Sequence, residues 1–451
     1  MKELFGTDGL RGLAGEFPLD GSTVKVIGAS LAAHLREELG RDPRIVTGRD
    51  TRESGLPIEA AFHAGARAEG VLCDSAGVIT TPGVAFLANV FDFDAGVVIS
   101  ASHNPFHDNG IKIFSPTGRK LGSEYEQKIE ADVSNCYGGS TDSRGISFGA
   151  ISLLRVNEFH KAYVNHLLEI GGDFSAEGKR IVMDCANGAS CDFAPELFRS
   201  IGAGVIAIHN DPDGRNINEN CGSLHLEHLQ KKVIEEKADL GVAFDGDADR
   251  ALFVDEKGNI VDGDATLWIM ARYLKGHERL ANSTVVATVM SNIGLEIALA
   301  SEQIRLLRTN VGDKYVLDEL IKTGSEIGGE QSGHIIFPEI SLVGDGMMTA
   351  LFLLRAVVEK GIPLSQAVAG FVRYPQTLVN VRVKEKRPFD DVPQIAASAR
   401  EIEGELNGNG RLLLRYSGTE DLARVMIEGK DQTAIEAQAR RLADVIAAAL
   451  N

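Results

Sequence analysis

The feature that most constrains the fold is a repeated alternation of short apolar runs with longer stretches of helical periodicity. Apolar residues recur at helical spacing over 24–39 and 58–69, and short apolar runs lie at 44–47, 70–74 and 95–99. Short buried strands that alternate with helices form βα crossovers and therefore sheets with parallel strands. The N-terminal part of the chain is predicted to be an α/β unit.

The same alternation continues through the middle of the chain. A second unit has a predicted helix over 193–201. Its predicted strands and closing hairpin lie at 180–183, 205–208, 240–244 and 252–261. Residues 265–360 repeat the pattern and predict a third unit.

The last part of the chain follows a different order. Its predicted elements are a strand at 377–383, a helix at 392–406, strands at 411–416 and 423–427, and a terminal helix whose apolar face carries Ile435, Ala439, Leu442, Ile446 and Leu450. This β-α-β-β-α order is typical of an α+β domain. The predicted fold class is three consecutive α/β units with mixed, largely parallel sheets, followed by an α+β domain, around a central cleft.

A chain of 451 residues is too long for one ordinary core and predicts several domains. A segment rich in Gly, Ser and Asp at 136–147 is the first candidate linker. The predicted domains are 1–147, 148–254, 255–366 and 367–451.

Composition limits the function classes. No apolar run approaches the roughly 20 residues that span a bilayer, and the first residues lack the apolar region of a signal peptide. The five cysteines contain no Cys-x-x-Cys pair, which predicts reduced thiols in a cytoplasmic protein. The net charge of −18 argues against a nucleic-acid surface. No membrane or nucleic-acid partner is therefore expected.

An acidic molecule needs a local group of basic residues to hold an anionic ligand. Five basic side chains are expected to form such a group, in loops rich in Gly or Ser. These are Arg11, Lys112, Arg250, Lys314 and Arg415.

Asp245, Asp247 and Asp249 directly follow the apolar run 240–244. In an extended segment, carboxylates at this spacing project to one side. They repel one another unless a cation neutralises them, and hard oxygen ligands suit Mg²⁺. A solvated acidic turn and a Ca²⁺ loop are the alternatives, and the preceding strand argues against an EF-hand.

Ser102 lies just past the apolar run 95–99, within Ser102-His103-Asn104-Pro105. A serine held at the carboxyl end of a strand beside polar side chains suits carriage of a covalent group. On these residues alone an ordinary turn is favoured. The segment 108–112 then returns Lys112 to the same region.

Two further polar loops stand out. The segment 329–334 places Glu330, Gln331, Ser332 and His334 between glycines, which supplies the donors and acceptors that sugar hydroxyls need. The segment 415–420 combines one guanidinium, two hydroxyls and backbone N–H groups that suit a phosphate dianion. Its candidate residues are Arg415, Ser417, Gly418 and Thr419. A surface loop and a plain hairpin are the respective alternatives.

Together with the segments 5–12 and 48–52, these loops resemble those of the alpha-D-phosphohexomutase family, from Phe5 to about Gly429. The resemblance implies that Ser102 carries the transferred phosphate and that Arg11 approaches it. It also implies that Asp245, Asp247 and Asp249 bind one Mg²⁺, with a phosphoserine oxygen completing the ligand set. Arg49 and Arg52 are expected to support the serine loop.

The resemblance also assigns the remaining candidates. Glu330 and Ser332 would recognise the sugar hydroxyls at O3 and O4. Gln331 matches the branch that acts on glucosamine phosphates, whereas relatives acting on glucose and mannose phosphates usually carry Met. The segment around Arg415 and the side chain of Lys314 would contact substrate phosphate. The other catalytic candidates are His103, Arg250, and Lys112 and His334 for proton transfer. The chain departs from the family pattern at Ala248, usually Gly, and at Asp421, often Pro.

The implied activity is interconversion of glucosamine 6-phosphate and glucosamine 1-phosphate, through a phosphoserine and hexosamine 1,6-bisphosphate, in the synthesis of UDP-N-acetylglucosamine. The expected partners are small-molecule hexosamine phosphates, and the resemblance allows a homodimer. Three other functions remain open: a phosphoglucomutase or phosphomannomutase, a Mg-dependent phosphatase whose nucleophile is Asp245, and a sugar-phosphate binding protein without catalysis.

Overall fold

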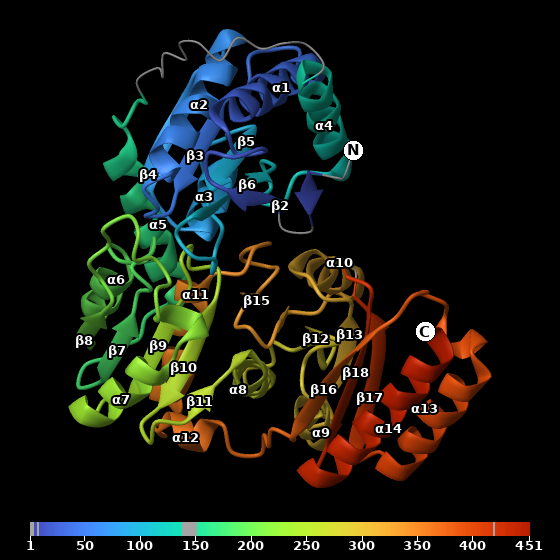
Figure 1. Cartoon of the computed structure of the whole chain (residues 1–451). Helices are drawn as coiled ribbons and strands as arrows, with labels where there is room; N and C mark the ends of the chain where they lie inside the picture. Colours follow the sequence, from blue (N-terminus) through green and yellow to red (C-terminus); the bar gives the residue numbers. More distant parts are fainter. Residues whose placement is uncertain (1–3, 7–8, 138–150, 418–419) are drawn as a thin grey trace. The chain divides into compact units, whose positions relative to one another are not determined.

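The computed structural model describes residues 4–6, 9–137, 151–417 and 420–451 (Figure 1). The described residues form four sheets that follow one another along the chain, with helices between their strands. They group into two compact units. The first consists of Met1–Thr288 and Leu307–Val368, and the second of Val289–Leu306 and Ala369–Asn451. Within the described part of the chain, no helix combines the length and hydropathy needed to cross a bilayer.

The first sheet has the strand order β1-β2-β6-β5-β3-β4 (Figure 1). Its strands are β1 (Phe5–Gly6), β2 (Gly9–Leu13), β3 (Ile45–Arg49), β4 (Cys73–Val78), β5 (Ala95–Ile99) and β6 (Asp108–Phe114). Its helices are α1 (Gly21–Leu39), α2 (Gly55–Ala68), α3 (Thr81–Val90) and α4 (Ser123–Tyr137). β3 runs parallel to β4 and β5, whereas β6 and β2 are antiparallel to their neighbours. The strand β5 is buried along its whole length, as its apolar sequence requires.

The second sheet has the order β11-β10-β9-β7-β8. Its strands are β7 (Arg180–Asp184), β8 (Gly204–Ile208), β9 (Leu240–Phe244), β10 (Ala251–Asp255) and β11 (Ile260–Val261), and its helices are α5 (Val156–Gly171), α6 (Ala194–Ser200) and α7 (Glu227–Glu236). β7 is parallel to β8 and β9, and β10 is antiparallel to β9 and β11. The predicted hairpin is thus confirmed, and the second sheet extends to Val261.

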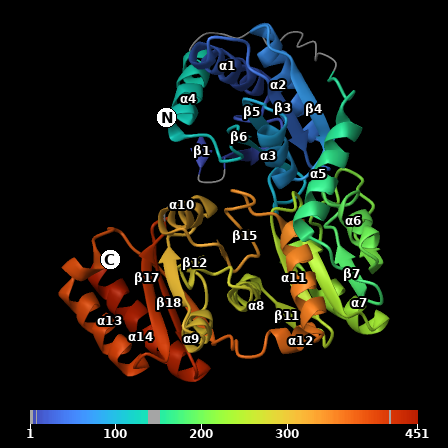
Figure 2. The same ribbon diagram turned by 180° about the vertical axis from the view of Figure 1, so that it is seen from behind.

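The third sheet has the order β13-β12-β14-β15. Its strands are β12 (Thr284–Thr288), β13 (Arg305–Thr309), β14 (Gly328–Gly329) and β15 (Ile335–Ile336), and the helices of this region are α8 (Gly263–Gly276), α10 (Asp313–Thr323), α11 (Gly346–Lys360) and α12 (Leu364–Ala367). The helix α11 packs against both α5 and α8 (Figure 2). This packing connects the second and third sheets within the first compact unit.

The three sheets share one local arrangement. β5, β9 and β14 each lie between a parallel neighbour and an antiparallel neighbour, and the antiparallel neighbour is the next strand of the chain. The connecting segments are residues 100–107, 245–250 and 330–334, which we call the junction loops. Each junction loop is therefore held at both ends by hydrogen-bonded strands.

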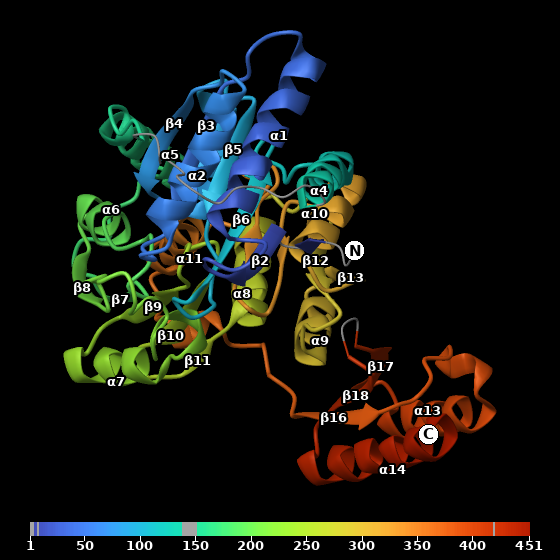
Figure 3. The ribbon, with the colours of Figure 1, turned by 45° about the horizontal axis from the view of Figure 1, so that its top comes forward.

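The second compact unit contains the antiparallel sheet β16-β18-β17, covered by two helices on one face (Figure 3). Its elements are α9 (Ile293–Ser301), β16 (Gln376–Arg382), α13 (Pro393–Leu406), β17 (Gly410–Tyr416), β18 (Leu422–Gly429) and α14 (Gln432–Leu450). All five predicted apolar positions of the terminal helix are buried. Glu428 joins α9 to the sheet, because its carboxylate accepts hydrogen bonds from the Ile293 N–H (3.1 Å) and Arg411 (3.0 Å).

The predicted elements are found in the predicted order in the described residues, with a local difference at one strand. The strand expected at 70–74 begins at Cys73, because Gly70, with a φ of 77°, turns the chain out of α2. The sheets of the first unit are mixed, and antiparallel strands make up a large part of each. The predicted linker lies mostly outside the described residues, and Cys136 belongs to α4.

Candidate active site

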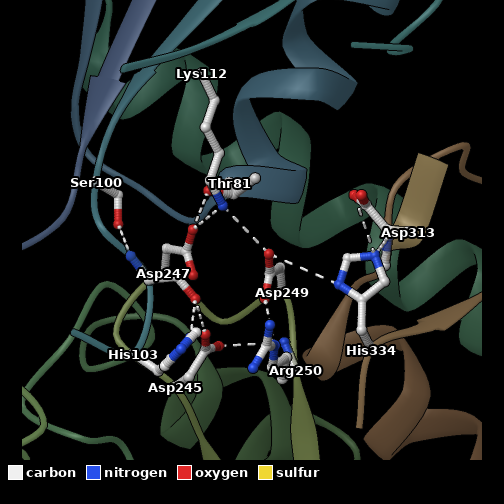
Figure 4. A network of polar contacts seen from close by, with 12 residues as sticks. Thr81, Ser100, His103, Lys112, Asp245, Asp247, Asp249, Arg250, Asp313 and His334 are labelled. Carbon is white, nitrogen blue, oxygen red and sulfur yellow. Dashed lines mark hydrogen bonds and ion pairs between the residues drawn. The ribbon is translucent and has the colours of Figure 1, made fainter. Parts of the chain in front are cut away.

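The three junction loops bring part of the predicted site together, including His103, the three aspartates, Arg250 and His334 (Figure 4). Ser102 comes from the first loop, the three aspartates and Arg250 from the second, and His334 from the third. Lys112 reaches the same place from β6. All of these residues belong to the first compact unit.

Ser102 is buried in a turn just after β5, as predicted. Its Oγ donates a hydrogen bond to an Asp245 carboxylate oxygen and lies 3.2 Å from the His103 Nδ1. Its backbone has a φ of 53°, which is uncommon for a residue with a side chain. Such a backbone persists only when the surrounding contacts fix it, and it is common at functional sites.

Asp245, Asp247 and Asp249 are buried, and one carboxylate oxygen from each lies within 4.8 Å of the others. They converge in a way that the sequence did not predict. The segment is a turn rather than an extended strand, and Ala248, with a φ of 55°, reverses its direction. The side chains therefore meet because the backbone curls around them.

Two cations neutralise part of this charge. The Lys112 Nζ lies 3.0 Å from an Asp247 oxygen and 3.4 Å from an Asp249 oxygen. The Arg250 Nε lies 3.7 Å from the other Asp249 oxygen, and the Arg250 N–H donates to Asp245. The surroundings of Lys112 are thus anionic, which is opposite to the cationic surroundings considered from the sequence.

The donor set fits a divalent cation with oxygen ligands. The Asp247 Oδ1 is buried and has no hydrogen-bond partner among the described residues. Burial raises the pKa of Asp245 well above its usual range, and the charges of Asp249 and Asp247 raise it further. Burial acts in the same direction on Asp249, but Lys112, His334 and Arg250 hold the pKa of that carboxyl well below its usual range. A cation would add to the partial charge compensation that Lys112 and Arg250 give the triad, and it would give a partner to the Asp247 Oδ1, which has none among the described residues.

The two histidines of the site have different environments. Burial lowers the pKa of His103 to about 4, and the charges of Arg250 and Arg11 act in the same direction, so this ring is neutral at pH 7. The His334 Nε2 accepts a hydrogen bond from the Gly344 N–H at 3.2 Å. In the neutral ring the proton is therefore on Nδ1, which lies 3.7 Å from an Asp249 oxygen.

The backbone of the serine loop is held by two side chains. The Arg52 guanidinium donates to the carbonyl oxygens of Ser102 (3.2 Å) and Asn104 (2.5 Å). The Asn218 amide donates to the same two oxygens at 2.9 and 3.0 Å. Arg52 thus has the supporting position expected for it, while Arg49 pairs with Glu59 instead. The guanidinium of Arg11 donates to the Asn104 side chain at 3.3 Å.

The third junction loop presents its polar side chains beside α8 and α10. Glu330 accepts a hydrogen bond from the Gly312 N–H at 3.2 Å, and the Ser332 hydroxyl lies 3.5 Å from the same carboxylate. The Gln331 amide donates to the buried Asp264 carboxylate at 3.3 Å. Lys314 is exposed in the first turn of α10.

The predicted phosphate loop belongs to the second compact unit. Arg415 lies near the end of β17, and Ser417 follows that strand. Gly418 and Thr419 lie outside the described residues. The departure at Asp421 does not place a charge inward, because this side chain is 88% exposed and its nearest recorded partner is Lys386 at 3.5 Å.

The expected placement of the basic residues in loops was wrong in four of five cases. Only Arg250 lies in a loop, while Arg11, Lys112 and Arg415 are on strands and Lys314 is on a helix. Gly12 lies inside β2 and Gly110 inside β6, so a glycine near a basic residue did not indicate a loop here. The sequence also gave no signal for Asn218, or for Thr81, which donates to Asp247 at 2.6 Å.

The paired hydrogen bonds of Asn218 lead to a first testable prediction. Asn218→Ala removes two donors to the serine loop, so kcat is expected to fall about 10-fold while KM changes little, since two such bonds contribute about 1–3 kcal/mol. Asn220→Ala is the matched control. Asn220 has a similar φ (53° against 58°) but is exposed. Equal kcat losses in both variants would show that the two Asn218 hydrogen bonds do not position Ser102.

Comparison with known proteins agrees with this architecture. Four models of the phosphoglucomutase/phosphomannomutase family match consecutive regions: alpha/beta/alpha domain I at residues 2–137, domain II at 161–258, domain III at 262–374 and the C-terminal domain at 378–445. The chain belongs to the phosphoglucomutase/phosphomannomutase family.

Similar proteins of known name indicate which branch of the family this chain resembles. The phosphoglucosamine mutase of Solibacter usitatus is 47% identical over 446 residues, which cover 99% of this chain and 98% of that protein. The phosphoglucosamine mutase of Deinococcus deserti is 46% identical over 447 residues, with the same coverage. Among solved structures, a phosphoglucomutase/phosphomannomutase family protein from Burkholderia thailandensis superposes with a TM-score of 0.80 at 22% identity, over 100% of this chain and 99% of that one.

Proposed function

We propose that this chain interconverts glucosamine 6-phosphate and glucosamine 1-phosphate, as the names of its relatives indicate, and so supplies amino-sugar metabolism. The observation that carries the proposal is a serine whose Oγ donates to a buried triad of carboxylates beside a buried lysine. Such a site can hold a phosphoryl group next to concentrated charge-neutralising groups. The full-length similarity to phosphoglucosamine mutases at 47% identity supports the choice of substrate.

The proposed reaction consists of two phosphoryl transfers. The phosphate on Ser102 passes to a free hydroxyl of the sugar phosphate. The P–Oγ bond breaks, a P–O bond to the sugar forms, and the sugar hydroxyl gives up its proton. The product, hexosamine 1,6-bisphosphate, then returns its other phosphate to Ser102. Both transfers need the reacting oxygens to be positioned in line and the negative charge to be offset.

Different residues of the chain would compensate charge, transfer the proton and bind the substrate. Lys112, Arg250 and Arg11 offset charge near Ser102. Lys112 and His334 are the candidates for taking up the hydroxyl proton: Lys112 does so only as the neutral amine, and His334 only when its Nε2 is released from the Gly344 N–H. Glu330 and Ser332 bind sugar hydroxyls, while Arg415, Ser417, Gly418, Thr419 and Lys314 contact the phosphate that is not reacting. His103 is neutral and lies beside Ser102 Oγ, where its ring nitrogen orients the hydroxyl.

The Asp triad would hold Mg²⁺, with an oxygen of phosphorylated Ser102 as a further ligand. When bound, the ion supplies charge stabilisation at the phosphoryl oxygens. Magnesium accompanies N-acetylglucosamine 6-phosphate in the solved N-acetylphosphoglucosamine mutase of Aspergillus fumigatus, which covers 99% of this chain at a TM-score of 0.63 and 19% identity.

The test is ³¹P NMR of the purified protein with Mg²⁺ and a trace of hexose bisphosphate. Glucosamine 6-phosphate and glucose 6-phosphate are supplied in parallel samples. Faster formation of glucosamine 1-phosphate than of glucose 1-phosphate is the expected result. Faster glucose conversion would place the chain with the phosphoglucomutases, and release of free phosphate without isomerisation would contradict the mutase mechanism.

Gln331 provides the second prediction. Gln331→Met removes the amide that donates to Asp264 and leaves an apolar side chain in the third junction loop. We expect the ratio of kcat/KM for glucosamine 6-phosphate to that for glucose 6-phosphate to fall about 10-fold, because loss of one polar contact discriminates on that scale. Retained glucose 6-phosphate turnover is the control for an intact site. An unchanged ratio would remove Gln331 from substrate selection.

Two further proposals accompany the function. A cytoplasmic location is supported by the five cysteines, all of which are free thiols in the structure. A homodimer and the four domain boundaries remain predictions. Light scattering of the purified chain tests the first, and limited proteolysis tests the second.

A further inference from the structure

A second group of metal-ligating side chains lies in the second sheet, apart from the site described above. Asp184 ends β7, His209 directly follows β8, and Cys221 lies just before a short 3₁₀ turn (Gly222–Leu224). One ligating atom from each lies within 4.8 Å of the others. We propose that these three side chains bind one transition-metal ion of the zinc type.

Asp184 and His209 are already in direct hydrogen-bond contact. The Asp184 Oδ1 accepts the Ala186 N–H at 2.9 Å, and the Asp184 Oδ2 lies 2.9 Å from the His209 Nδ1. The opposite nitrogen of that ring, Nε2, lies 3.3 Å from the His228 Nδ1. A metal-binding imidazole generally uses one nitrogen for the ion and donates its other N–H to a fixed acceptor. His228 fills that second position.

Cys221 adds a sulfur donor to the group, whereas the Asp triad of the active site has only oxygen donors. The side chain is 1% exposed, and burial, with the charge of Asp184 in second place, raises the pKa of its thiol to about 12. A cation at this point would replace the thiol proton and the Nδ1 proton of His209. Thiolate, imidazole and carboxylate together favour Zn²⁺, whereas the all-oxygen Asp triad suits Mg²⁺.

The distances are compatible with tetrahedral coordination after small movements. Zinc–ligand bonds of about 2.0–2.3 Å place neighbouring donors about 3.3–3.8 Å apart. The three ligating atoms lie no more than 4.8 Å apart, and the Asp184–His209 distance is 2.9 Å, so the separations differ from this range by about 1 Å or less. Rotations of the side chains close that difference, and water would take the fourth position.

The proposed ion would stabilise the segment that carries Asn218, the residue that holds the backbone of the first junction loop. Cys221 belongs to the same loop as Asn218, whose amide holds Ser102 and Asn104. The Asn218 N–H donates to the carbonyl of Ala186, two residues after Asp184. The ion would therefore fix the two segments that carry the Asn218 side chain into contact with the serine loop.

The experiment uses Co²⁺ as a spectroscopic probe on the full chain after removal of metal. Co²⁺ bound to thiolate gives a sulfur-to-metal charge-transfer band that the Asp triad, which lacks sulfur, cannot produce. We expect this band to saturate at one equivalent and Zn²⁺ to displace it. Cys221→Ser and His209→Gln are each expected to weaken Zn²⁺ binding by at least about 100-fold, more than loss of an outer partner costs.

Cys191→Ser is the matched control, since Cys191 is also a buried thiol of this region but lies outside the group of three. It should keep the band. Absence of the band in the unmodified chain, or its persistence in Cys221→Ser, would overturn the proposal. Thermal unfolding of each variant without metal checks that the fold is retained. The readout is independent of the proposed mutase activity.

Discussion

Replacement of Ser102 by alanine is expected to lower mutase turnover by about 10⁴-fold or more, the scale of losing a nucleophile that forms a covalent intermediate. The variant should also lack the mass of one phosphoryl group that the active protein carries. Folding should be retained, because alanine and serine are similarly disfavoured at a φ of 53° and the Arg52 and Asn218 contacts go to the backbone. Steady-state kinetics and intact mass spectrometry measure both effects.

Ser100→Ala is the matched control. Ser100 is a buried serine of the same loop, and its Oγ accepts the Ser102 N–H at 2.9 Å. The variant loses this hydrogen bond and the one between the Ser100 side chain and the Asp50 carboxylate, which should reduce turnover by about 10-fold or less and leave phosphorylation intact. Phosphate release that persists in Ser102→Ala would instead favour the phosphatase alternative with Asp245 as nucleophile.

Asp245→Asn is expected to lower activity by about 10³-fold without lowering the stability of the metal-free protein. The activity loss follows from weaker cation binding, since an ion contributes several kcal/mol to such transfers. The stability result follows because burial, as the largest cause, raises the pKa of Asp245. A carboxyl whose pKa is raised in the folded state contributes stability that is present below its unfolded pKa of about 4 and is lost as the pH rises through its folded pKa. Asparagine removes this charge.

Thermal unfolding with Mg²⁺ and with a chelator tests the second part. The unmodified chain should gain stability from Mg²⁺, whereas Asp245→Asn should lose this gain and have an unchanged or higher midpoint in the chelator. Asp255→Asn is the control, because Asp255 is a buried carboxylate that accepts hydrogen bonds in the β10–β11 turn. It should unfold earlier but keep its response to Mg²⁺. A markedly lower chelator midpoint in Asp245→Asn would contradict this account.

Elements and loops whose signal is local could be predicted from the sequence. The run 95–99 is β5, and 240–244 is β9, because each is a continuous apolar segment bounded by polar residues. The position of Ser102 just past a buried strand followed directly. The positions of the three aspartates also followed, although the turn that brings them together did not.

Contacts across distant segments could not be predicted in the same way. Asn218 contacts a carbonyl 116 residues away, and Thr81 contacts an aspartate 166 residues away. Neither residue has a local pattern that distinguishes it from an ordinary turn or helix N-terminus. The partners of Lys112 depend likewise on how the first sheet packs against the second. A sequence pattern predicts the strand that carries a side chain, but it does not predict which distant residues that side chain contacts.

The junction loops have a consequence for how such a chain can arise. The same connection, between a strand with a parallel neighbour and the next antiparallel strand, occurs in three successive sheets. Duplication of one ancestral unit would supply three anchored loops before any of them had acquired a chemical role. A few substitutions in each copy could then specialise one for carrying a group, one for holding an ion and one for recognising hydroxyls. Specialisation of this kind leaves the supporting strands unchanged.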